Sequence, residues 1–129
     1  MIDSHCHLDM EPISNNLNEV INRSKEAGVE KFLTICTTDD GYKNILNIAN
    51  SESFIYGTYG IHPHEADKYK ITKNHIIEQV KLSKKIIGVG ETGLDFYYNN
   101  SDKINQCNSF QKHIEASLEL DLPIIVHSR

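Results

Sequence analysis

An α/β fold with a parallel sheet is the class that the 129-residue sequence predicts, and three observations support it. Short apolar runs of strand length alternate with longer segments in which apolar residues recur every three or four positions, as on one face of a helix. The alternation holds along the whole chain. No linker, repeat or low-complexity segment interrupts it. This order pairs strands in parallel through right-handed crossovers and covers the sheet with helices.

The elements are expected to alternate from a first strand to a fifth. The expected strands comprise residues 1–9, 31–36, 54–59, 85–90 and 122–126. Helices are expected between them, each with a residue suited to cap it where the sequence offers one. They run from a cap at Ser14 to Gly28, from a cap at Asp39 or Asp40 through Ala49, from about 72 to 84, and from 102 to about 120.

The last of these helices has the clearest periodicity in the chain. We expect its repeating positions to form the face that packs against the sheet. These positions are Ile104, Cys107, Phe110, Gln111, Ile114 and Leu118.

The number of strands bears on the domain organisation. A closed barrel of eight strands and eight helices takes about 250 residues, whereas this chain supplies five strands in about half that length. We therefore expect an α/β barrel that is truncated after the fifth strand, with residues 1–129 as the N-terminal part of a single domain. The alternative is a complete five-stranded doubly wound domain.

The composition is that of an ordinary soluble globular protein, with 39% hydrophobic and 24% charged residues. No apolar run has the length of a membrane span and no leader pattern precedes the first strand, so we expect a cytoplasmic protein without a membrane partner. Cys6, Cys36 and Cys107 are widely spaced, which favours buried thiols. The net charge of −5 argues against a general basic surface for nucleic acid, but two divalent ions would supply positive charge locally.

The first strand carries the first candidate site. Side chains alternate between the two faces of a strand, so Asp3, His5 and His7 share one face, and the two histidines are about 6–7 Å apart. One metal ion can bridge that distance. Neutral imidazoles and a carboxylate suit Zn, Mn, Fe or Ni, and a buried row of such groups needs a partner charge.

Ionisable residues also end two later strands. Glu91 follows the fourth strand and His127 follows the fifth. Singly, Glu91 could bond to the next turn and His127 could be a core histidine. In parallel sheets, however, the carboxyl ends of the strands form one functional rim, so we expect His5, His7, Glu91 and His127 to meet there. Glu91 would then provide a carboxylate that can bridge two metal ions about 3.5–4 Å apart.

The loop after the third strand places two more histidines near this rim. We expect His62 to contact substrate. His64 could lie either at the rim or on the surface, and the sequence does not decide between the two. Asp95 could orient a histidine ligand through its other ring nitrogen, and Gly93 would permit a tight turn. His75 and His113 do not lie at strand ends, so we expect surface or helix-packing roles.

Three further residues could contact substrate. Tyr97 and Tyr98 could stack on nucleobases, or they could simply pack at the rim. Arg129 could pair with a phosphate or with a neighbouring carboxylate.

These motifs, in this order, resemble the TatD family of metal-dependent deoxyribonucleases. The Gly-Glu-Thr-Gly-Leu-Asp block and the terminal His-Ser-Arg are more specific than the His-x-His pair, which other barrels of the amidohydrolase type share. The matching segments span the chain and comprise residues 3–9, 60–64, 90–97, 110–111 and 122–129.

The resemblance implies a TIM-type (β/α) barrel that hydrolyses phosphodiester bonds of DNA, single-stranded or at an end. It implies two divalent metal ions (Mg, Mn or Zn), with His5, His7, Glu91 and His127 as ligands, Glu91 bridging them as the catalytic carboxylate, and His62 contacting substrate. In the family, a further histidine and the catalytic aspartate lie on strands beyond the five expected here, so residues 1–129 alone could be inactive.

Two other readings stay open. One is a different metal hydrolase on the same scaffold that acts on small amides, lactones or phosphoesters, which the acidic net charge favours. The other is a non-catalytic, metal-binding chain. In that case the fifth strand would leave an exposed edge, through which copies could self-associate.

Overall fold

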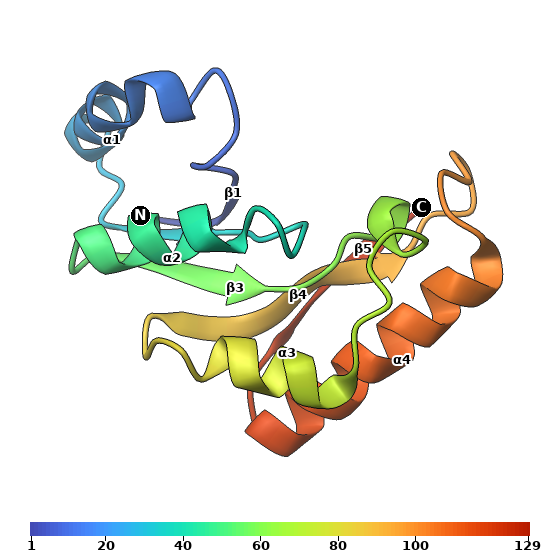
Figure 1. Ribbon diagram of the computed structural model, residues 1–129. Coiled ribbons are helices and arrows are strands. Elements are labelled where there is room, and N and C mark those ends of the chain that lie inside the picture. Colours follow the sequence, from blue (N-terminus) through green and yellow to red (C-terminus); the bar gives the residue numbers. More distant parts are fainter.

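The computed structural model describes residues 1–129 and contains one five-stranded sheet (Figure 1). All neighbouring strands are parallel, and their order in the sheet follows the sequence, from β1 to β5. A doubly wound sheet reverses its strand order at a switch point, so the sequential order excludes that alternative. The strands are β1 (Ile2–Cys6), β2 (Lys31–Thr34), β3 (Ile55–Tyr59), β4 (Ile86–Leu94) and β5 (Ile124–Ser128).

A helix connects each strand to the next, which confirms the predicted alternation. In Figure 1, α3 and α4 lie side by side along β3 and β4. None of the helices combines the length and the apolar character that crossing a membrane requires. The helices are α1 (Leu17–Glu26), α2 (Tyr42–Ser51), α3 (Lys73–Val80) and α4 (Lys103–Leu120), with short 3-10 turns η1 (Ser14–Asn16) and η2 (Pro63–Glu65).

Two apolar clusters hold the sheet to its helices. The larger one joins α2 and α3 to β3 and β4, and its members include Tyr42, Ile45 and Val89. The smaller one fixes β1 and β2 against α1 through Ile21 and Phe32. These clusters pack the sheet against its helices. Because all neighbouring strands are parallel, the carboxyl ends of the strands lie at one rim of the sheet.

The helix starts differ from the prediction at two places. Ser14 begins η1 instead of capping α1, whose N-cap is Asn16 without a side-chain bond. Neither Asp39 nor Asp40 caps α2, because that helix starts after Gly41. Both carboxylates instead accept hydrogen bonds from side chains that are distant in sequence.

β4 is longer than predicted, and β5 begins and ends two residues later in the sequence than predicted. β4 continues beyond residue 90 to Leu94, and β5 ends at Ser128, so Glu91 and His127 lie within strands and not after them. Gly93, which was expected in a tight turn, pairs with His127 in the sheet at φ +143°. A Cβ atom there would lie 2.0 Å from the carbonyl oxygen of His127, so glycine allows the two strands to approach.

The face of α4 that packs against the sheet was predicted wrongly. Ile104 and Leu118 of the predicted face are 71% and 76% exposed. The buried face is instead largely polar. Gln106, His113 and Ser117 find hydrogen-bond partners there, whereas the buried hydroxyl of Ser109 has none. The members of this face are Gln106, Ser109, His113, Ala116 and Ser117.

The cysteines and the sheet edges complete the comparison. Cys36 is buried and Cys6 is half-buried, but Cys107 lies on the exposed side of α4, so the expectation of a buried thiol was wrong there. β1 and β5 form the two edges of the sheet, and each has only one neighbouring strand.

Candidate metal centre at the carboxyl ends of the strands

The first strand delivers two histidines to the rim. Ile2–Cys6 is extended, so the alternation of side chains places His5 and His7 on one face, with ring centroids 5.4 Å apart. The opposite face is anchored by Cys6, whose thiol donates to the carbonyl of Leu33, and by buried Leu8. Nδ1 of His7 lies 3.2 Å from the carbonyl oxygen of Ile35, a contact that fixes this ring and leaves its Nε2 facing the rim.

Glu91 lies between two pairs of imidazoles. Its Oε2 is 3.4 Å from Nε2 of His5 and 4.0 Å from Nε2 of His7. Its Oε1 is 3.2 Å from Nδ1 of His127 and 4.0 Å from Nε2 of His62. Only 8% of Glu91 is exposed, so this carboxylate is a buried charge that requires cationic or hydrogen-bonding partners on both sides.

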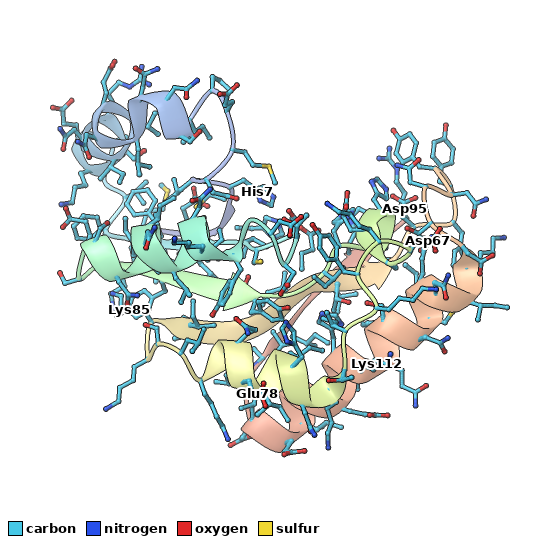
Figure 2. All side chains as sticks on the ribbon, in the orientation of Figure 1. His7, Asp67, Glu78, Lys85, Asp95 and Lys112 are labelled. Atoms are coloured by element: carbon cyan, nitrogen blue, oxygen red, sulfur yellow. The ribbon has the colours of Figure 1, made fainter.

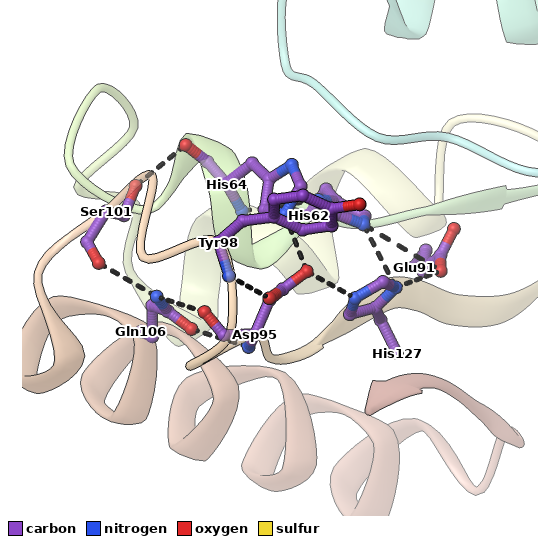
Figure 3. Close-up of polar contacts among 8 residues, drawn as sticks. All are labelled: His62, His64, Glu91, Asp95, Tyr98, Ser101, Gln106 and His127. Atoms are coloured by element: carbon purple, nitrogen blue, oxygen red, sulfur yellow. Dashed lines mark hydrogen bonds and ion pairs between the residues drawn. The ribbon is translucent and has the colours of Figure 1, made fainter. Parts of the chain in front are cut away.

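His127 connects Glu91 to a second carboxylate. Its Nδ1 faces Glu91, while its Nε2 lies 3.0 Å from Oδ2 of Asp95 (Figure 3). Burial of Asp95 would raise its pKa, but the N–H of Tyr98 and the imidazoles of His64 and His127 outweigh that effect and hold the pKa below its usual range. The ionised Asp95 therefore accepts from Nε2–H of His127.

His62 enters the site from the turn η2. Its Nδ1 accepts from the backbone N–H of His64 at 3.2 Å. Burial lowers the pKa of His62 to about 4, although the charge of Glu91 acts against this shift. The ring is therefore neutral at pH 7 and carries its proton on Nε2, which lies 3.2 Å from Nδ1 of His127.

His64 belongs to the site and not to the open surface. Its Nε2 lies 2.7 Å from Oδ2 of Asp95, and its ring packs edge-on against His62 with centroids 4.5 Å apart. Ser101 fixes the same turn because its hydroxyl donates to the carbonyl of His64 at 2.7 Å.

Gln106 holds Asp95 in place, a role that the sequence did not reveal. Its Oε1 accepts from the backbone N–H of Asp95 at 2.8 Å. Its Nε2 donates to the carbonyls of Asp95 and Ser101 (Figure 3). A single glutamine early in a helix gives no signal by itself, because its partners are brought together only by the fold.

A pocket of about 350 Å³ lies over this network. Met10 is its only hydrophobic lining residue, so the pocket suits a polar or charged ligand. The wall beside α2 is formed by Thr37 and Thr38, which were not predicted as site residues. The lining also includes His5, His7, His62, His64, Glu65 and Glu91. In Figure 2, His7 and Asp95 lie on opposite sides of the rim.

A hydrogen-bonded cluster steadies the wall at Thr37 and Thr38. Asp39 accepts from the hydroxyl of buried Tyr59, and Nε2 of His75 lies 2.9 Å from its Oδ1. These bonds outweigh the effect of burial and lower the pKa of Asp39. His75 thus has a packing role, as expected.

Comparison with known proteins bears on what this geometry means. The family model described as "TatD related DNase" matches residues 2–129. The chain belongs to the TatD family. An "Uncharacterized metal-dependent hydrolase" of Buchnera aphidicola is 36% identical, with 100% of this chain and 49% of the relative covered. A Danio rerio protein named "Putative deoxyribonuclease tatdn3" is 29% identical, with 99% and 53% covered.

Solved structures of TatD proteins share the fold. The crystal structure of YjjV, a TatD homologue of Escherichia coli, superposes with a TM-score of 0.89 at 28% identity and is covered to 51% by the whole chain. A TatD family hydrolase from Entamoeba histolytica superposes with a TM-score of 0.86 at 20% identity and is covered to 50%. The chain thus spans about half the length of its relatives, as expected for five strands of an eight-stranded barrel.

The TatD residues present here fit a metal ion on chemical grounds. When His127 donates Nε2–H to Asp95, its Nδ1 becomes an acceptor that faces the acceptor Oε1 of Glu91 at 3.2 Å. The protonated Nε2 of His62 lies 3.2 Å from the same Nδ1, and a metal ion at this point would replace that contact and bind both acceptor atoms. Three groups have all their ligand atoms within 4.8 Å of one another: His5, His7 and Glu91; His62, Glu91 and His127; and His64, Asp95 and His127.

The structure therefore brings the four predicted ligands together and adds others. His5, His7, Glu91 and His127 converge as the sequence indicated, and Asp95 makes the predicted contact with a histidine. His62 was predicted only as a substrate contact, yet its Nε2 also stands within one of the three groups. Arg129 contacts neither a carboxylate nor the pocket. It lies over the rings of Tyr97 and Tyr98.

Proposed function

We propose that residues 1–129 are the N-terminal part of a single barrel that hydrolyses phosphodiester bonds of DNA with two divalent metal ions. The observation that carries this proposal is the position of Glu91, whose two oxygens face two separate pairs of imidazoles. A carboxylate with imidazole nitrogens near each of its two oxygens is suited to bind two metal ions at the same time. The family name and the name of the Danio rerio relative favour DNA as the substrate.

In this proposal His5, His7 and Glu91 hold one ion, and Glu91 and His127 contribute to a second. Such ions, whether Mg, Mn or Zn, lower the pKa of bound water and stabilise negative charge on phosphate oxygens. By accepting the proton of Nε2, Asp95 would leave Nδ1 of His127 as an acceptor, which a metal ion would bind in place of the Nε2–H of His62.

Neutral His62 contributes a hydrogen-bond donor to the pocket. Its Nε2–H is directed toward Glu91 and His127, so it can donate to a phosphate oxygen held at the same point. The imidazoles and the metals would supply positive charge only inside the pocket. The acidic exterior of the protein is compatible with a nuclease for that reason.

The experiment compares substrates and metals. The intact barrel that contains these residues is incubated with Mg²⁺, Mn²⁺ or Zn²⁺ and with end-labelled single-stranded DNA, duplex DNA, bis(p-nitrophenyl) phosphate or a cyclic amide. We expect metal-dependent cleavage of DNA, abolished in Glu91→Ala, while Glu65→Gln tests for a general effect of acidic residues at the pocket. Hydrolysis of the amide without cleavage of DNA would instead identify a different metal hydrolase.

Metal binding is measured on residues 1–129 alone as well, because this chain spans about half the length of its relatives. Calorimetric titration with Mn²⁺ gives the number of ions bound per chain. Binding of metal without hydrolysis of any substrate would support the non-catalytic alternative for this chain.

A further inference from the structure

Three consecutive aromatic side chains are exposed next to the candidate metal centre. Phe96, Tyr97 and Tyr98 follow β4 after a single residue, Asp95, and are 41%, 74% and 51% exposed. Side chains that merely packed against the rim would be largely covered. These rings instead present apolar faces to solvent at the edge of a polar pocket.

Two cations accompany the rings. The guanidinium of Arg129 lies 5.4 Å from the ring centroid of Tyr97 and 4.8 Å from that of Tyr98. Nζ of Lys103 lies 5.0 Å from the centroid of Phe96. Neither Arg129 nor Lys103 forms an ion pair with a carboxylate, although the chain carries a net charge of −5. The rim is therefore locally cationic as well as aromatic.

This aromatic rim (Phe96, Tyr97, Tyr98 and Arg129) is tied firmly to the metal centre. The backbone N–H of Tyr98 donates to Oδ1 of Asp95, while Oδ2 of Asp95 contacts His64 and His127. The ring of Tyr98 meets that of His64 edge-on, with centroids 5.8 Å apart. Arg129 is held by backbone bonds to Leu94 and Phe96. A group resting on the rim would lie one side chain away from the pocket.

We propose that the aromatic rim binds an unpaired nucleobase adjacent to the phosphodiester in the pocket, with Arg129 directed to a neighbouring phosphate. This inference rests on the proposed function and assigns the contact with a base to named residues outside the pocket lining. Aromatic faces accept any base that is free of its own stacking neighbours, whereas the bases of an intact duplex are covered. The combination of exposed rings and unpaired cations is typical of surfaces for single-stranded nucleic acid.

The experiment separates bases from backbone. Binding of a short, fluorescently labelled oligothymidine to the whole chain is compared with binding of an abasic oligonucleotide of the same length, both with Ca²⁺ present. We expect Tyr97→Ala/Tyr98→Ala to weaken binding of the oligothymidine about ten-fold and to leave binding of the abasic strand unchanged. Tyr97→Phe/Tyr98→Phe keeps the rings and should bind like the parent.

Two controls complete the design. Arg129→Gln should weaken the binding of both oligonucleotides. Lys84 is an exposed lysine outside the pocket lining, so Lys84→Gln should weaken the binding of neither. Unchanged Mn²⁺ binding in each variant shows that the fold is intact, because the backbone bond from Tyr98 to Asp95 survives substitution.

The outcomes distinguish this inference from the proposed function. Oligothymidine binding that persists in the double alanine variant, or an equal loss for both ligands, would overturn the base-binding role while leaving DNA cleavage intact. If the parent chain does not bind DNA and the intact barrel does not cleave it, the proposed function fails and the base site fails with it.

Discussion

Asp95 lies 3.0 Å from Nε2 of His127, on the opposite side of the imidazole ring from Glu91. The ring is thus held between two carboxylates, one fully buried and one at the pocket. Asp95 determines which nitrogen of His127 keeps its proton and which faces the candidate metal centre.

We predict that Asp95→Asn weakens metal binding. An amide oxygen is a weaker acceptor than a carboxylate, so His127 loses part of its orientation and its basicity. A loss of about 10–100-fold in Mn²⁺ or Zn²⁺ affinity is expected from such a change behind a ligand, as measured by calorimetric titration. Asp67→Asn, at an exposed carboxylate that bonds to Asp102 and Asn105, is the matched control. Equal affinity of the parent and Asp95→Asn would contradict the role of Asp95.

The number of metal ions should depend on which ligand is removed. His5 belongs only to the group on the β1 side, whereas Glu91 belongs to the groups on both sides. We therefore predict that His5→Ala lowers the stoichiometry from two ions to one, and that Glu91→Ala abolishes tight binding of both. Counting bound Mn²⁺ by titration tests this, and an unchanged stoichiometry in Glu91→Ala would exclude a shared carboxylate.

Much of this site was predictable from the sequence because it depends on local rules. The alternation of side chains in an extended segment places His5 and His7 on one face whatever the rest of the fold does. The carboxyl ends of parallel strands meet at one rim, so Glu91 and His127 could be added without knowing any distance.

The predictions that were wrong concern residues whose hydrogen-bond partners are distant in sequence. Periodicity counts apolar residues, but α4 buries Gln106 and His113 because the backbone groups of Asp95 and Ile61 lie opposite them. Asp39 is well suited to cap α2, yet Tyr59 and His75 compete for its carboxylate in the folded chain. A pattern along one segment contains no information about such neighbours.

The approach of β4 to β5 should make Gly93 intolerant of substitution. Gly93 and Gly28 both have positive φ, at +143° and +92°. A Cβ atom at Gly28 meets nothing within 4 Å, whereas one at Gly93 would lie 2.0 Å from the carbonyl oxygen of His127. Gly28→Ala should cost about 1–2 kcal/mol in the free energy of unfolding, and Gly93→Ala about 3–5 kcal/mol. Urea unfolding measures both, and equal costs would show that the strands can separate without penalty.

His113 should make stability depend on pH. Burial lowers its pKa to about 4, compared with about 6.5 for an exposed histidine. Its Nε2 accepts from the backbone N–H of Ile61, which requires the neutral ring. The unfolded chain takes up a proton below pH 6.5 while the folded chain resists until about pH 4. The stabilisation is therefore complete above pH 6.5 and decreases by about 3 kcal/mol as the pH falls toward 4.

The test compares the parent with His113→Gln in urea unfolding between pH 7.5 and pH 4. Glutamine can accept from Ile61 and donate to the carbonyl of Ser109, but it does not titrate. Other histidines contribute equally to both proteins, so the difference in slope isolates His113. Parallel pH profiles for the two proteins would assign the dependence elsewhere.

We also propose that copies of this chain self-associate. The edge strand β5 has one neighbour, and the exposed side of α4 adds apolar surface at Ile104 and Leu118. An open edge beside exposed apolar residues favours pairing with another chain. Sedimentation velocity should show dimers or larger species whose population rises with concentration. Leu118→Lys should shift this equilibrium toward the monomer, whereas Leu82→Lys, at an equally apolar exposed residue that follows α3, should not. A parent chain that stays monomeric at high concentration would refute the proposal, because neither the edge nor the α4 surface would then be adhesive.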